Sequence, residues 1–168
     1  TIAGGLGLTD VTLTGNTARD GGGIYRQGGG AGTLTVESST LTANGTTFKG
    51  AGIYISGGTA RVENSTIAGN NGGASGGIGL AAGANLTVRH ATIAGNVGPG
   101  IVNTASVLAL DNSIVANNFN SLNSPTDVQG DFTAVGANLV RVRTGTLLSG
   151  PAPLTADPLL DALAGGSK

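Results

Sequence analysis

Apolar and polar residues alternate in short runs that recur along the chain. The segments 34–37 (LTVE) and 86–89 (LTVR) both follow the order apolar, polar, apolar, polar. A period of two is typical of a β-strand with one buried face, because successive side chains point to opposite sides of the strand. The pattern therefore predicts strands whose Leu and Val residues form a core and whose Thr, Glu and Arg residues face solvent.

A six-residue motif repeats through the first two thirds of the sequence. It reads VTLTGN at 11–16, STLTAN at 39–44, STIAGN at 65–70, ATIAGN at 91–96 and NSIVAN at 112–117. The spacing of 21 to 28 residues accommodates three short strands and three turns, and is too short for repeats built on two helices. The sequence therefore predicts an all-β solenoid, a parallel β-helix of about five coils. It should be right-handed, because connections between parallel strands have this hand almost without exception.

Each repeat carries two further signals for a corner of the coil. Glycines precede an isoleucine in GGGIY (to Tyr25), GAGIY (to Tyr54), GGIGL (to Leu80) and GPGIV (to Val102), as a tight corner requires. The asparagine that ends each six-residue motif can bond amide to amide with its equivalent in the next coil. We predict a structural ladder of Asn16, Asn44, Asn70, Asn96 and Asn117.

The repeat weakens after residue 118. Residues 1–118 are predicted to form regular coils, and residues 119–168 an irregular final coil with a C-terminal cap or tail of the same domain. Within the second part, a strand pair is expected around residues 132–142.

These runs, with GANLV and ADPLL near the C-terminus, resemble right-handed β-helix repeats of bacterial surface proteins related to polymorphic outer-membrane protein repeats. The resemblance covers nearly the whole chain. It implies an extracellular or cell-surface location and a structural or adhesive role, and says little about activity.

Composition excludes several classes of function. Only 10% of residues are charged, the net charge is −1, and the eight basic residues are scattered, so nucleic acid is not an expected partner. No apolar run is long enough for a direct membrane span, and the lack of Cys excludes disulfides and thiolate metal sites. No cofactor is expected.

Acidic residues offer little support for catalysis. Glu37 and Glu63 occupy equivalent positions in adjacent coils, but Arg89 follows at the same position, which indicates a solvated, charge-paired face. No catalytic residue is predicted. Asp127 and Asp131 in the irregular region are candidates for a calcium site, although they match no known ligand spacing.

The surface offers two further candidates. Tyr25 and Tyr54 are equivalent in adjacent coils, so they could form an aromatic platform for sugars or simply stabilise neighbouring strands. Ile2, Leu6 and Leu8 lead into the first coil with no capping segment, which predicts an assembly end. That end would receive a second copy head to tail, giving surface fibres, or an adjoining domain of a larger surface protein.

The sequence thus favours a non-catalytic extracellular structural or adhesive β-helix module. The alternative is a glycan-binding or glycan-cleaving, pectate-lyase-like β-helix.

Overall fold

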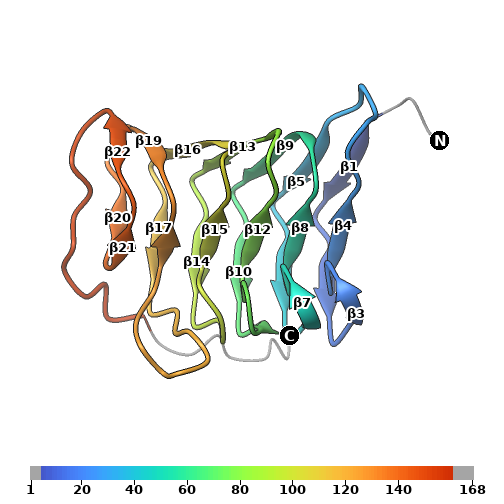
Figure 1. The fold of residues 1–168 in the computed structure, drawn as a ribbon, viewed down its shortest axis with the longest axis horizontal. Coiled ribbons are helices and arrows are strands. Elements are labelled where there is room, and N and C mark those ends of the chain that lie inside the picture. The colour runs from blue at the N-terminus through green and yellow to red at the C-terminus, as the bar shows by residue number, and fades with distance from the viewer. Residues whose placement is uncertain (1–4, 161–168) are drawn as a thin grey trace.

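The computed structural model describes residues 5–160 as strands and turns, and no helix occurs in that range. The chain winds into a β-solenoid of about five turns, with successive coils side by side along its long axis (Figure 1). Every named strand pairing is parallel and joins equivalent strands of adjacent coils. The predicted all-β parallel solenoid is therefore confirmed. Within the described range, no helix is long and apolar enough to cross a membrane.

Three sheets run along the solenoid, one on each side of the coil. Sheet A contains β1 (Leu6–Thr9), β5 (Leu34–Glu37), β9 (Gly58–Glu63), β13 (Ala84–Arg89), β16 (Val107–Asp111), β19 (Phe132–Val135) and β22 (Leu147–Ser149). Sheet B contains β2 (Thr12–Thr14), β6 (Thr40–Thr42), β10 (Thr66–Ala68), β14 (Thr92–Ala94), β17 (Ile114–Ala116) and β20 (Leu139–Val140). Sheet D contains β4 (Ile24–Arg26), β8 (Ile53–Ile55), β12 (Ile78–Leu80), β15 (Ile101–Asn103), β18 (Val128–Gln129) and β21 (Arg143–Thr144).

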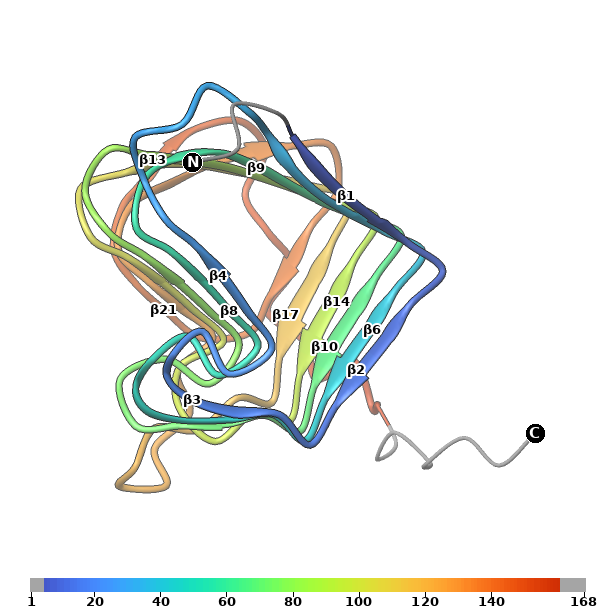
Figure 2. The ribbon, with the colours of Figure 1, turned by 90° about the vertical axis from the view of Figure 1, so that its right-hand side faces the viewer.

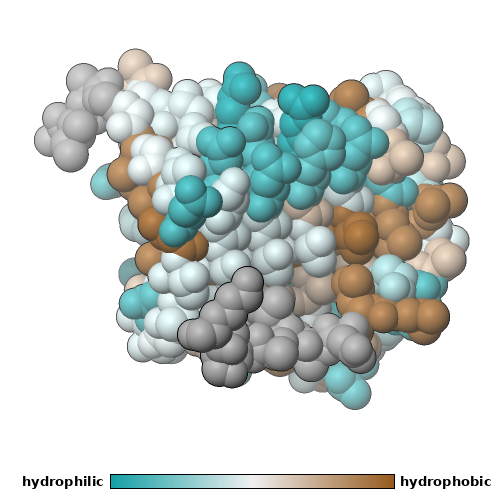
Figure 3. Space-filling view, turned by 180° about the vertical axis from the view of Figure 1, so that it is seen from behind, coloured by the Kyte–Doolittle hydropathy of each residue, from teal (hydrophilic) through white to brown (hydrophobic). Residues whose placement is uncertain are grey.

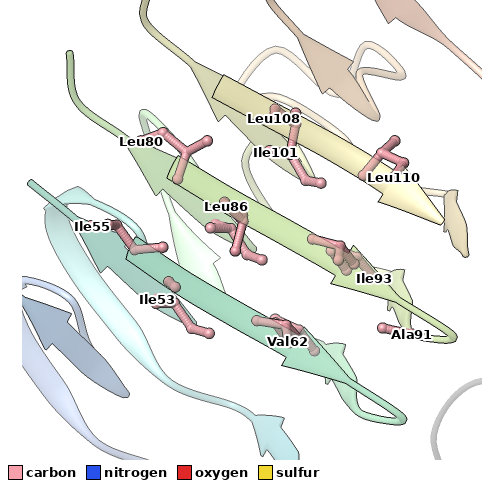
Figure 4. Close-up of a cluster of buried hydrophobic side chains, with 14 of the residues drawn as sticks. Ile53, Ile55, Val62, Leu80, Leu86, Ala91, Ile93, Ile101, Leu108 and Leu110 are labelled. Carbon is pink, nitrogen blue, oxygen red and sulfur yellow. The ribbon is translucent and has the colours of Figure 1, made fainter. Parts of the chain in front are cut away.

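The core consists of aliphatic columns that run parallel to the solenoid axis. In sheet D, Ile53, Ile78 and Ile101 are paired in register and fully buried. Figure 4 shows such side chains from successive coils turned into the interior. Burying each of them contributes about 1.5–3 kcal/mol to stability. A sequence that repeats an aliphatic residue once in each coil is therefore stabilised by every coil it adds.

A fourth sheet, which the sequence analysis did not predict, projects from the corner between sheets B and D (Figure 2). Sheet C consists of β3 (Thr17–Asp20), β7 (Gly45–Lys49) and β11 (Asn71–Gly72). It follows the ladder asparagine in the first three coils, and single bridges through Val97 and Phe119 continue it. We call this projection the spur.

Candidate functional site

Asparagines form a hydrogen-bonded ladder along the interior, beside the spur. Asn44 donates from its backbone N–H (2.9 Å) and its Nδ2 (3.0 Å) to Oδ1 of Asn70, which donates in the same way to Asn96. The second Nδ2 hydrogen of Asn70 bonds the carbonyl of Leu41 in the preceding coil. Asn44, Asn70 and Asn96 are fully buried. Each of these side chains therefore links three coils.

The prediction for Asn117 is wrong by one residue. Asn118 occupies the ladder, because its Oδ1 accepts from the backbone N–H (3.2 Å) and Nδ2 (2.8 Å) of Asn96. Asn117 takes the corner position before it, with a φ of 59° like the 62° of Gly95, and accepts a bond from Arg141 Nη1. Asn tolerates this left-handed conformation. Either of these adjacent asparagines could be aligned with the asparagine of the repeated motif. The backbone conformation shows that Asn117 is the corner residue and Asn118 the ladder residue.

Asp127 ends the ladder. Its Oδ1 accepts from the backbone N–H (3.0 Å) and Nδ2 (2.9 Å) of Asn118, and its Oδ2 accepts from the Val142 N–H. A carboxylate suits this position because both of its oxygens must accept. Burial raises the pKa of Asp127, while hydrogen bonds from Asn118 and Val142 and the charge of Arg141 limit that rise.

This role does not agree with the calcium hypothesis for Asp127 and Asp131. The buried Asp127 carboxylate is already occupied by three N–H donors, whereas Asp131 is exposed and accepts from the Thr146 N–H. Across residues 5–160, no three His, Cys, Asp or Glu side chains gather as a metal site would require.

The ladder has a direction, so its two ends differ. Asn16 donates from its backbone N–H and Nδ2 to Asn44 Oδ1, both at 3.0 Å. No residue of the described range donates to the Oδ1 of Asn16, which is exposed. The ladder is thus open at the N-terminal end and closed by Asp127 at the other.

A second ladder of buried polar side chains was missed by the sequence analysis. Ser39 Oγ accepts from the Val11 N–H, and Ser65 Oγ accepts from the Ser39 N–H at 3.0 Å. The series is interrupted at Ala91 and resumes at Ser113, whose N–H donates to Asn138 Oδ1. The signal in the sequence was the serine that opens two of the repeated motifs, at Ser39 and Ser65, and that stands second in NSIVAN, at Ser113.

Tyr25 and Tyr54 are brought together as predicted from their register. Their rings are stacked, with centroids 5.6 Å apart and planes inclined by 12°. Burial, then the charges of Asp20 and Tyr25, raise the pKa of Tyr54. Each ring therefore covers one face of the other, and 51% of Tyr25 remains exposed.

Cations from the spur lie beside the rings of Tyr54 and Phe48. Lys49 Nζ lies 5.9 Å from the Tyr54 centroid and 5.0 Å from that of Phe48, and the Arg19 guanidinium lies 5.5 Å from Phe48. These distances permit cation–π attraction. We call Arg19, Phe48, Lys49, Tyr54 and Tyr25 the aromatic–cation patch. Next to it, the spur has a hollow of about 480 Å³, lined by Thr17, Ala18, Arg19, Gly45, Thr46, Thr47 and Asn71.

The charged face lies on sheet A. Glu37 pairs in register with Glu63, Glu63 with Arg89, and Arg89 with Asp111, to which it forms an ion pair at 3.2 Å. Figure 3 shows hydrophilic side chains gathered over this part of the molecule. The two glutamates are therefore the start of a mixed-charge column on the surface.

Apolar side chains are exposed at both ends of the solenoid. At the N-terminal end, 54% of Leu6 is exposed, while Leu8 packs partly against the core. Ile2 lies outside the described residues. At the C-terminal end, Leu148 and Leu154 are 63% and 64% exposed, and Figure 3 shows a hydrophobic area there.

Parallel sheets, inward aliphatic columns and polar ladders define a β-helix repeat protein. Residues 3–140 match the family model described as the right handed beta helix region, and the chain belongs to this family. Neither a curated protein nor a solved structure matches the chain.

Proposed function

We propose that this chain is a non-catalytic structural or adhesive module of an extracellular or cell-surface protein, of the bacterial kind that its repeats resemble. The observation that carries the proposal is the use of buried polar groups. Asn70, for example, uses both Nδ2 hydrogens and its Oδ1 in hydrogen bonds to neighbouring coils. Side chains used in this way hold a stiff rod together.

The charged column on sheet A supports the same function. Glu63 is flanked along the column by Glu37 and Arg89, and Arg89 pairs with Asp111. Ion pairs at a protein surface contribute about 0–1 kcal/mol each, and the Asp111 side chain of this pair is largely covered while Arg89 remains exposed. The charged residues of this column neighbour one another, so the column does not present a single acid beside a single base for catalysis.

The test is an assay for glycan cleavage combined with limited proteolysis. We expect no new reducing ends from polygalacturonate or chitin, and a folded core that resists protease. Cleavage that disappears in Glu63→Gln but persists in Glu37→Gln would show an active carboxylate and refute the proposal.

The aromatic–cation patch favours a second function, glycan binding. Aromatic faces contact the C–H surfaces of sugars, and Lys49 and Arg19 offer N–H donors. Because Tyr54 is covered on one side by Tyr25, the ligand would stack on the outer face of Tyr25.

Saturation-transfer NMR with chitotriose and with trigalacturonate tests this function. We expect transfer from the tyrosine rings in the wild type and its loss in Tyr25→Ala. Thr35→Ala, on the outward side of sheet A, is the control. Transfer that survives Tyr25→Ala would place binding elsewhere.

A further inference from the structure

The N-terminal edge exposes one complete cross-section of the coil. Strands β1, β2, β3 and β4 are each the terminal strand of their sheet. Leu13 is partly buried, whereas its equivalent Leu41, one coil further in, is fully buried. The same edge carries Asn16, the open end of the ladder. One further coil would cover all of these groups.

We propose that this edge docks a parallel coil of another β-helical segment, which carries an asparagine at the ladder corner. The inference rests on the structural function proposed above and specifies the partner. Every buried ladder asparagine accepts two N–H donors from the preceding coil, as Asn70 does from Asn44. Asn16 offers the same acceptor with no donor from residues 5–160.

Asn16 also shows which donor–acceptor pattern the partner must have. Asn44, Asn70 and Asn96 each donate their second Nδ2 hydrogen to a carbonyl of the preceding coil. Within residues 5–160 no carbonyl accepts the equivalent hydrogen of Asn16, so it is available to bond such a carbonyl. A coil stacked in the same direction and register, with asparagine at the corner, supplies the carbonyl and both N–H donors, whereas a coil without that asparagine lacks the Nδ2 donor.

Backbone groups of the edge point to the same partner. The Thr40 N–H donates to the Val11 carbonyl and the Gly45 N–H to the Asn16 carbonyl, each in the preceding coil. Thr12 and Thr17 are the register equivalents of Thr40 and Gly45. Their N–H groups therefore face the open edge, where a parallel coil would present carbonyls.

A second copy of this chain is a poorer occupant. Head-to-tail stacking would bring the C-terminal end of one copy to Asn16, but there the ladder ends in Asp127, which has no Nδ2 donor and whose two carboxylate oxygens already accept from Asn118 and Val142. Two N-terminal edges placed together would oppose one Asn16 Oδ1 to another. The interface that does fit is the one repeated between coils inside the molecule.

The test adds one coil to the N-terminal edge, in place of residues 1–4. A copy of residues 65–84 is joined in front of Gly5. Ala84 is the register partner of Gly58, which lies two positions before Ala60, and Gly5 lies one position before the equivalent of Leu34 and Ala60. The copied Ala84 therefore leads into Gly5 without a shift in register. This register places the copied Asn70 over Asn16. The matched control carries Asn70→Ala in the copied segment only.

Amide hydrogen exchange gives the result. We expect exchange at Thr12 and Thr17 to slow by about tenfold or more, as one added hydrogen bond implies, with a smaller effect in the control. The slow amide of Ile67 shows in each protein that the core remains folded. Unchanged exchange at Thr12 and Thr17, or equal protection in graft and control, would refute the proposal.

A separate measurement addresses self-assembly. Sedimentation of the wild-type chain at rising concentration should show no end-to-end growth. Growth that Leu6→Lys abolishes would mean that a second copy occupies the edge, and would overturn this inference while leaving a structural function in place. Glycan cleavage would refute the proposed function without changing the exchange result.

Discussion

Substituting Asn118 and Asn117 separately tests the geometry of the ladder. Asn118→Ala removes the Oδ1 that accepts from the backbone N–H and Nδ2 of Asn96, both of them buried. It also removes the Nδ2 donor to the Ile93 carbonyl and to Asp127. Two buried donors left without acceptors cost about 1–3 kcal/mol each. We therefore expect a loss of about 3–5 kcal/mol in the free energy of unfolding.

Asn117→Ala is the matched control, one residue away in the same turn. It removes one bond, from Arg141, at a partly buried site. Alanine is acceptable at this corner, since Ala43 has a φ of 53° in the equivalent position. The expected loss is about 1 kcal/mol or less.

Urea unfolding followed by far-ultraviolet circular dichroism measures both changes, because the chain has no Trp to serve as a fluorescence probe. Hydrogen exchange at the Asn96 amide adds a local readout, which should accelerate only in Asn118→Ala. Equal losses for the two variants, or a larger loss for Asn117→Ala, would refute the assignment of Asn118 to the ladder.

Three further predictions concern other buried or partly buried groups. Ala91→Ser should supply an Oγ acceptor for the backbone N–H of Ser65, as Ser65 does for Ser39, and raise the free energy of unfolding by about 0.5–1.5 kcal/mol. An unchanged urea midpoint would contradict this. The raised folded-state pKa of Asp127 means that its contribution to stability is present below about pH 3.8 and declines as pH rises through that pKa. Asp127→Asn should flatten this part of the pH profile of the unfolding midpoint, and an unaltered slope would argue against it. Asp20→Asn should lower the pKa of Tyr54 toward 10.0, measured by tyrosinate absorbance, and a rise would exclude the assigned charge effect.

The repeat in the sequence predicted the coil, because stacking in register demands the same residue type once per turn. Ile53, Ile78 and Ile101 could be aligned by inspection and are paired in the structure. The same regularity explains why Tyr25 and Tyr54 were expected to be neighbours.

Prediction failed where local conformation or chain path decides the outcome. The choice between Asn117 and Asn118 depends on which residue takes the left-handed corner, and a letter pattern does not contain that information. Asp127 enters the ladder only because residues 119–126 loop out and return. The spur was missed since its strands pair outside the regular coil, with no apolar alternation to mark them.

The corner that follows each ladder asparagine changes in length and path from coil to coil. The chain forms strands of the spur after Asn16 and Asn44, turns within residues 97–100 after Asn96, and makes a longer excursion through residues 119–126 after Asn118. The rungs on either side stay in register throughout. Insertions at this corner lengthen the perimeter without disturbing the interior, which makes it the natural place to graft foreign loops for display along a rigid scaffold.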